Sequence, residues 1–218
     1  MDQSRIFTIR IRGDLACFTI PALSVERVSA PFITPSAARG LLEAILWKPA
    51  IKWVIREIQI LAPIRYIQFR RNEVNSRLSV SSVNSIRKSS VPLNYFADED
   101  RAQRNTVALR DVDYAVSAQM IMTKRRGPED SIRKFEEMFE RRLEKGQQVT
   151  QPVLGCREFP AIVEKFDGTV NPIQDSQDFG VVLHDLEYGF SNRPYFFRAF
   201  MRSGRIAVPD IEGHNASQ

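Results

Sequence analysis

Hydrophobic residues follow two different periodicities along the first 166 residues, and this pattern most limits the possible fold. Several segments place an apolar residue at every second position or are rich in β-branched residues, as half-buried strands are. We expect Gly13 and Asp14 to turn the chain after the first of them. The predicted strands cover residues 5–12, 52–61 with a shorter strand over 64–69, 112–122, and 153–166 with a break near Pro160.

Two segments between these strands have apolar residues at helical spacing instead. The first covers residues 35–47, after Thr34, which is a typical N-cap, and before Pro49. The second covers residues 129–145 and stops at Gly146. The order of elements is therefore strand, helix, strand, then a loop, and then the same order again.

Two β-α-β units form the ferredoxin-like split arrangement, an antiparallel sheet with two helices on one face, as in RNA-recognition modules. We therefore predict an α+β protein with a ferredoxin-like, RRM-like core over residues 1–166. Residues 72–106, rich in Ser and Asn, are expected to form a mobile loop or an inserted hairpin. Residues 167–218 are expected to form a small appended antiparallel β-sheet domain with a frayed tail. Its strand candidates are 180–188, 195–202 and 205–208.

Composition excludes several classes of protein. With 43% hydrophobic and 26% charged residues, the chain has enough apolar surface for a core. It has no apolar run long enough to span a membrane, and its first residues lead directly into a strand pattern, so we expect a cytoplasmic protein. Cys17 and Cys156 are far apart in sequence and outside any CxxC motif, so we interpret both as reduced packing residues.

Charge is distributed unevenly. Residues 1–166 hold 27 basic and 19 acidic residues, a balance of +8, whereas residues 167–218 hold 4 and 7, a balance of −3. A basic body of this kind favours a polyanion as partner, with solvated surface charge as the alternative. The densest stretch is 52–88, with eight basic residues against Glu57 and Glu73.

The motifs of most cofactor enzymes are absent, including the Walker loop, GxGxxG, HExxH and GxSxG. We therefore expect no cofactor and no metal. The two histidines, His184 and His214, cannot form a multi-histidine metal site, and we interpret His184 as structural. RNA cleavage needs neither metal nor cofactor, because the substrate's 2′-OH is its own nucleophile. A lysine with an ordinary pKa of about 10.4 stays protonated at neutral pH and stabilises phosphorane charge.

Three ordered motifs resemble the subtype I-C CRISPR-associated Cas5d family of the RAMP superfamily. Residues 35–49 (PSAARGLLEAILWKP) resemble its first-helix motif, residues 109–114 (LRDVDY) its third-strand signature, and residues 154–158 (LGCRE) its LGxRE segment. The resemblance implies a protein that cuts precursor CRISPR RNA within each repeat without a metal. It also implies a 2′,3′-cyclic phosphate product and retention of the 5′ handle within the interference complex.

The same resemblance implies site residues, and this sequence departs from two of them. The family uses a Tyr before the motif Trp and a Lys-His pair near the second helix, whereas here Leu46 precedes Trp47 and Phe135 follows Lys134. Only Lys134 carries over as a catalytic candidate, with a solvated helix residue as the alternative. Candidates to replace the missing groups are Lys48, Tyr66 and Tyr95.

Several basic residues at strand ends and on the first helix are candidates to grip RNA phosphates, and Trp47 is a candidate to stack on a base. A core position is the alternative for Trp47, and a structural pair with Glu158 or another acid is the alternative for Arg157. The RNA-binding candidates are Arg39, Trp47, Arg70, Arg71, Lys124, Arg125, Arg126 and Arg157.

Three functional hypotheses follow. The first is an endoribonuclease that acts on a CRISPR repeat RNA hairpin. The second, motivated by Leu46 and Phe135, is a non-catalytic RNA-binding subunit that caps the 5′ handle and contacts the backbone and large subunits of the interference complex. The third is non-specific binding of duplex DNA through the basic face, which would weaken steeply with salt.

Overall fold

The computed structural model describes residues 2–23, 26–76, 98–187 and 193–210, with isolated positions between 79 and 96. The elements are β1 (Phe7–Ala16), β2 (Arg27–Val28), α1 (Pro35–Ile45), β3 (Ile51–Ile60), β4 (Tyr66–Val74), β5 (Arg101–Met122), α3 (Ile132–Glu144), β6 (Ile162–Lys165), β7 (Gln177–Glu187), β8 (Arg193–Arg202) and β9 (Arg205–Ala207). In the described part of the chain, nine strands form one sheet, seven of them in the order β6-β1-β5-β3-β9-β8-β7, with β2 and β4 also paired to β5. Apart from the parallel pair of β2 and β5, neighbouring strands are antiparallel.

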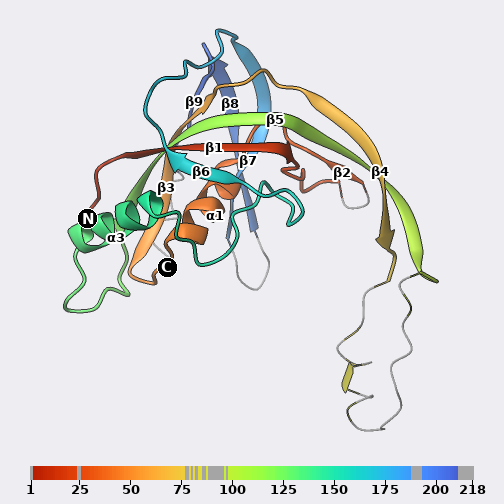
Figure 1. The fold of residues 1–218 in the computed structure, drawn as a ribbon, viewed down its shortest axis with the longest axis horizontal. Helices are drawn as coiled ribbons and strands as arrows, with labels where there is room; N and C mark the ends of the chain where they lie inside the picture. Colours follow the sequence, from red (N-terminus) through yellow and green to blue (C-terminus); the bar gives the residue numbers. More distant parts are fainter. Residues whose placement is uncertain are drawn as a thin grey trace.

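Helices α1 and α3 lie on the same side of this sheet, below it in Figure 1. The core between α3 and the sheet is aromatic. Phe139 of α3 is fully buried, and its ring centroid lies 5.2 Å from that of Phe7 on β1 and 4.7 Å from that of Trp53 on β3. Burying one such side chain stabilises the fold by about 1.5–3 kcal/mol, so this cluster holds α3 against the sheet.

Side-chain caps define the start of both helices. The hydroxyl of Thr34 accepts a hydrogen bond from the backbone N–H of Ala37, and Ser131 does the same for Lys134, which satisfies amides that have no partner inside the helix. Gly146 follows α3 with a φ of 61°, as predicted for a glycine stop. The predicted helices 35–47 and 129–145 are therefore confirmed, each slightly too long.

The predicted turn at Gly13 and Asp14 is wrong, because β1 continues through them to Ala16. Gly13 pairs with Val112 within the ladder between β1 and β5. A Cβ at this position would lie 2.3 Å from Leu154 Cδ1 and 3.0 Å from the carbonyl oxygen of Pro160. The glycine therefore permits close packing of the 154–160 segment and does not form a turn.

Strands β4 and β5 extend further into residues 72–106 than predicted. Their ladder runs from Tyr66 opposite Leu109 to Val74 opposite Arg101, so both ends of that segment are strand. Figure 1 shows the two strands projecting from the body of the sheet; we call β4 with residues 101–109 of β5 the arm. The mobile loop or hairpin predicted between them falls largely outside the described residues, as does Tyr95.

The C-terminal strands continue the core sheet, so the expected separate sheet is corrected. Ile206 of β9 is fully buried and pairs with Ile58 of β3, while Met201 of β8 pairs with Ile206. A three-residue strand gives too weak a pattern to identify its partner from sequence. The division into domains at residue 166 stays a prediction.

Helices in the described part of the chain are too short or too polar to cross a membrane. The described residues also contain no group of three or more His, Cys, Asp or Glu side chains placed to hold a metal ion.

Candidate active site and nucleic-acid interface

The turn after α1 and the loop between β5 and α3 meet at one end of the sheet. The backbone N–H of Thr123 donates to the carbonyl of Ala50 at 2.9 Å, and its hydroxyl donates to the carbonyl of Pro49 at 2.6 Å. These bonds bring several predicted site residues into one region, which we call the basic cluster. Its members are Trp47, Lys48, Lys124, Arg125, Arg126, Asp130 and Lys134.

Asp130 organises the middle of the basic cluster. One carboxylate oxygen accepts from the backbone N–H of Gly127 at 2.9 Å, and the other accepts from Lys134 Nζ at 3.1 Å. The Gly127 amide, the Lys134 ammonium and the charge of Lys48 together lower the pKa of Asp130. A negative carboxylate therefore holds Lys134 in place.

Lys134 remains accessible in spite of this ion pair, since 47% of its side chain is exposed. An exposed pair of this type contributes little to stability and can be exchanged for another anion. The ammonium can therefore leave Asp130 for a phosphate that enters the basic cluster.

Trp47 is exposed, which disfavours the core alternative. Its exposed fraction is 58%, whereas that of Trp53 is 2%, and the indole N–H of Trp53 donates to the carbonyl of Leu46 at 2.9 Å. Trp53 therefore fills the aromatic core, and the ring of Trp47 has surface available for stacking. Its contact with RNA stays a prediction.

The two positions that depart from the resembled family are both buried. Leu46 is fully buried beneath the end of α1, and Phe135 of α3 is 2% exposed. Neither side chain can contact a substrate at the surface. Any proton transfer in the basic cluster must therefore use other groups.

The exposed basic side chains near Lys134 come from the loop after β5. Lys124, Arg125 and Arg126 are all exposed, and Arg126 pairs with Asp2 at 2.8 Å. The loop thus places three cations beside Lys134 and Lys48, as a phosphate-binding surface requires.

Tyr66 does not join the basic cluster. It begins β4 opposite Leu109, whereas the cluster starts beyond Met122, 122 − 109 = 13 positions further along β5. At about 3.4 Å per residue this is roughly 40 Å along the strand. Burial raises the pKa of Tyr66, although the residue is partly exposed.

A second basic group lies on the arm, where most charges are already paired. Arg71 pairs with Glu73 at 2.9 Å and with Glu158, and Glu73 also pairs with Arg27 at 3.0 Å. Arg157 is exposed, and the Glu158 beside it pairs with Arg71, so the expected alternative of an Arg157–Glu158 pair is not what the structure contains.

Arg70, also on the arm, is exposed and makes a long contact of 3.4 Å with Gln103. Its neighbour Arg71 is half-buried in the ion pairs just described. Arg70 and Arg157 are thus the predicted RNA-binding residues of the arm region that present an exposed guanidinium.

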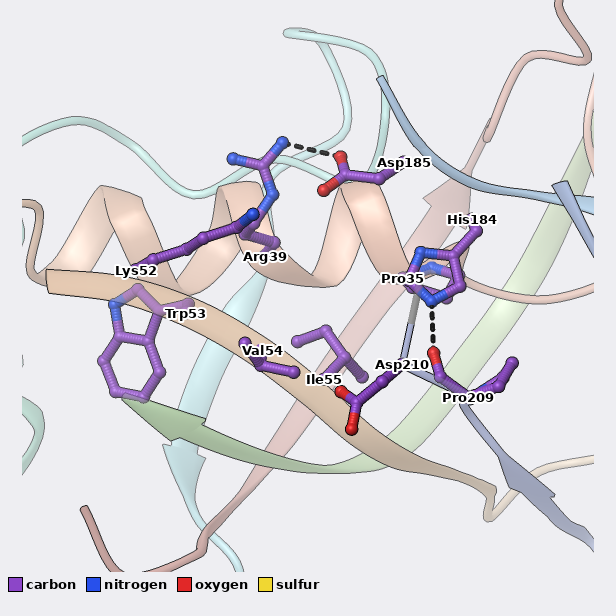
Figure 2. Close-up of a pocket in the computed structure, with 10 residues that line it drawn as sticks. All are labelled: Pro35, Arg39, Lys52, Trp53, Val54, Ile55, His184, Asp185, Pro209 and Asp210. Atoms are coloured by element: carbon purple, nitrogen blue, oxygen red, sulfur yellow. Dashed lines mark hydrogen bonds and ion pairs between the residues drawn. The ribbon is translucent and has the colours of Figure 1, made fainter. Parts of the chain in front are cut away.

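Arg39 is held in an internal ion pair between α1 and β7, shown in Figure 2. Its guanidinium donates to Asp185 at 2.8 Å and to Glu43 at 2.7 Å, and the Arg39 and Asp185 side chains are 16% and 8% exposed. Burial alone would lower the pKa of Arg39, but the charges of Asp185 and Glu43 outweigh it and raise that pKa. In this arrangement the residue joins two elements, and its predicted RNA contact finds no support in the geometry.

His184 lies in the same pocket as Arg39 (Figure 2). Its Nε2 is 2.8 Å from the carbonyl oxygen of Pro209, and its ring meets Phe197 edge to face at 5.4 Å. These contacts agree with the structural interpretation of this histidine.

Sequence reasoning missed Asp130 and the partner of Arg39. The spacing of four residues between Asp130 and Lys134, both within the helix predicted over 129–145, was an available signal for the first. For the second no local signal exists, because Arg39 and Asp185 are 146 positions apart.

Comparison with known proteins shows the family. The sequence profile of the Cas5d family, described as CRISPR-associated protein (Cas_Cas5), matches residues 6–209. This chain belongs to the Cas5d family. A protein from Mannheimia succiniciproducens named CRISPR pre-crRNA endoribonuclease Cas5d is 46% identical over 211 residues, covering 92% of this chain and 93% of that protein. A protein of the same name from Thermus thermophilus is 37% identical over 221 residues, covering 92% and 90%.

Solved structures agree on the fold. A structure titled as a CRISPR-associated protein has a TM-score of 0.74 at 22% identity, covering 99% of this chain and 97% of that one. A functionally uncharacterised protein of Streptococcus mutans has a TM-score of 0.69 at 25% identity, covering 96% and 95%. The large antiparallel sheet with its helices is therefore the architecture of this group.

Proposed function

We propose that this chain is an endoribonuclease that cuts precursor CRISPR RNA within the repeat without a metal ion. The observation that carries the proposal is the basic cluster, in which Lys134 pairs with Asp130, the charge of Lys48 helps to lower the pKa of that carboxyl, and Trp47 is exposed. The names of the relatives from Mannheimia and Thermus, which include pre-crRNA endoribonuclease activity, support it.

The chemistry proposed is a transesterification. The 2′-oxygen attacks the adjacent phosphorus, its proton passes to a base, the bond from phosphorus to the 5′-oxygen breaks, and that oxygen takes up a proton. The products are a 2′,3′-cyclic phosphate and a 5′-hydroxyl. Lys134 stabilises the negative charge of the phosphorane, and Lys48 is the candidate for proton delivery to the leaving oxygen. Tyr66 lies too far along β5 to share this step.

The fold proposed for the core is ferredoxin-like. Its support is the partial strand order β6-β1-β5-β3, with α1 following β1 and α3 following β5, as two interleaved β-α-β units would give. In this arrangement α1 ends and α3 begins at the same end of the sheet. That places the end of α1 and the start of α3 together in the basic cluster.

A second candidate function is binding without cleavage. Leu46 and Phe135 are buried where the resembled family uses a Tyr and a His, so the cluster lacks those two proton-transfer groups. With this second function, the protein would cap the 5′ handle and contact the backbone and large subunits of the interference complex. Binding of duplex DNA would be an accessory activity of the exposed cations.

The test uses the purified protein, its own end-labelled repeat RNA and EDTA, with a substrate carrying 2′-deoxyribose at the cleavage position as control. We expect one discrete cut that the 2′-deoxy substrate lacks. Cutting of the 2′-deoxy substrate would exclude the mechanism, and tight binding without any cut would favour the capping function.

The role of Lys134 is tested in single-turnover experiments at saturating protein. Removing one electrostatic stabiliser of a transition state slows the chemical step about 100-fold or more, so Lys134→Ala should do so. The matched control is Lys145→Ala at the exposed end of the same helix, which should cut at the normal rate. Equal rates for the two variants would remove Lys134 from the mechanism.

A further inference from the structure

Strand β8 has an aromatic and basic outer face. Phe196, Arg198 and Phe200 alternate with the buried residues Phe197 and Ala199, so the first three point away from the core. Phe196 is 50% exposed and Phe200 is 47% exposed. Two phenylalanines on the solvent side of one strand require an explanation, because polar residues usually occupy such positions.

Strand β7 extends this face. Val181, opposite Arg198 in the ladder, is exposed, and Leu183 lies opposite Phe196. We call the exposed surface formed by Val181, Phe196, Arg198, Phe200 and Arg202 the β8 face. The α1 helix contacts β7 through the pair of Arg39 and Asp185, and Val181, Phe196 and Phe200 remain exposed beside that contact.

Positive charge is concentrated here against the local trend. Residues 167–218 carry only four basic residues, and all four are arginines of β8 or β9, namely Arg193, Arg198, Arg202 and Arg205. Arg202 lies over the ring of Phe200, with its Cζ 5.4 Å from the ring centroid. Arginine, unlike lysine, both pairs with phosphate and stacks on planar rings.

The acidic partners on this face are exposed and exchangeable. Arg198 pairs with Asp178 at 2.6 Å and Arg205 with Glu57 at 3.2 Å, and all four side chains are open to solvent. Surface pairs of this kind contribute about 0–1 kcal/mol. A phosphate can therefore replace the carboxylate at low cost.

We propose that the β8 face binds single-stranded nucleic acid, with unpaired bases stacked on Phe196 and Phe200 and phosphates paired with Arg198 and Arg202. Sheet aromatics interleaved with cations form such platforms, because every base has a face that can stack. The two rings are four residues apart, roughly 13 Å along the strand, so they hold different bases. The arginines favour this occupant over an apolar protein surface.

This site is distinct from the basic cluster. In the sheet order β8 lies near the edge formed by β7, whereas β6, which α3 contacts, forms the opposite edge. The inference therefore goes beyond the proposed cleavage. It concerns single-stranded RNA or DNA that binds the β8 face while the repeat occupies the basic cluster.

The test measures fluorescence anisotropy of labelled ten-nucleotide uridine and thymidine oligomers, neither of which contains the repeat, with the full chain. The variant Phe196→Leu/Phe200→Leu retains apolar surface and removes both aromatic faces. We expect its affinity for both oligomers to fall about tenfold or more, since each stacked ring contributes at least about fivefold. The matched control Phe96→Leu, which removes an equally exposed phenylalanine elsewhere, should bind normally.

Retention of wild-type affinity by the double Leu variant would overturn the proposal and indicate a surface for an apolar protein partner. If that variant does not fold, Arg202→Gln gives an independent measurement. It should reduce the slope of log K against log salt by about 0.7 for a lost single-strand phosphate contact. An unchanged slope would also overturn the proposal. Both measurements are independent of repeat cleavage, because the oligomers contain no cleavage site.

Discussion

Replacing Arg39 by methionine tests whether this residue supports the fold or grips RNA. Methionine keeps the aliphatic part of the side chain and removes the guanidinium that pairs with the buried carboxylate of Asp185. Breaking a buried ion pair by removing one member costs about 3–5 kcal/mol. Glu43 is more exposed and can be hydrated, so we expect the lower figure of about 3 kcal/mol.

The assay is thermal unfolding followed by RNA binding of the folded protein. For a chain of this size 1 kcal/mol shifts the melting temperature by about 2–4 °C, so Arg39→Met should lower it by roughly 6–12 °C. The matched control is Arg133→Met, which removes an exposed i,i+4 pair with Glu137 and should change it by less than about 2 °C. The affinity of folded Arg39→Met for repeat RNA should be unchanged.

A double variant, Arg39→Met/Asp185→Leu, checks the cause. An apolar pair of similar volume often replaces a buried ion pair without loss, so the second change should recover part of the stability. A melting temperature for Arg39→Met equal to that of Arg133→Met would refute the structural role. A fall in RNA affinity without a fall in stability would restore Arg39 as a phosphate contact.

Three further changes have defined outcomes. Gly13→Ala should lower the free energy of unfolding by about 1–3 kcal/mol, because its Cβ would meet Leu154. Gly40→Ala, where a Cβ has open space in α1, should leave the stability unchanged or raise it. A larger loss of stability for Gly40→Ala than for Gly13→Ala in thermal unfolding would contradict the packing described. Trp47→Ala should weaken repeat binding about fivefold or more without changing the melting temperature, and an unchanged dissociation constant would exclude stacking. Asp130 has a folded-state pKa below its unfolded value, so its contribution to stability is present above the unfolded pKa and is lost as pH falls through the folded one. Asp130→Asn should therefore flatten the acid side of the stability profile, and a profile identical to wild type would show that the carboxylate contacts are not made in solution.

Local signals predicted the helices well because helix ends depend on nearby residues. Thr34 caps α1 and Gly146 follows α3, as each sequence pattern indicates. The turn at Gly13 failed for the opposite reason, since the close approach of Leu154 is a long-range contact. Glycine alone does not distinguish a turn from tight packing between distant segments.

Strand extents and partners were harder to predict. The 22 residues of β5 include the polar stretch near Arg101, where hydrophobic alternation fails because residues 101–105 are exposed or only partly buried. The pairing of β9 with β3 depends on Ile206 meeting Ile58, and three residues carry too little pattern to show it. Cys17 and Cys156, distant in sequence, lie in contact and are both buried and free.

Only part of the candidate site could be predicted, because the sequence shows which residues are basic but not which carboxylates pair with them. Arg39 and Arg71 are each held by two carboxylates, so they serve the structure first. Lys134, itself exposed, is paired with one partly buried aspartate and can exchange it.

These cations differ in the free-energy cost of separating each one from its carboxylate. Around Asp185 a departing guanidinium would leave a buried charge, whereas around Asp130 water can replace the ammonium. An arriving phosphate can therefore compete for Lys134 and not for Arg39. We therefore expect RNA to pass over the loop after β5 and the start of α3 and to bypass the middle of α1, although that helix carries the longest of the family motifs.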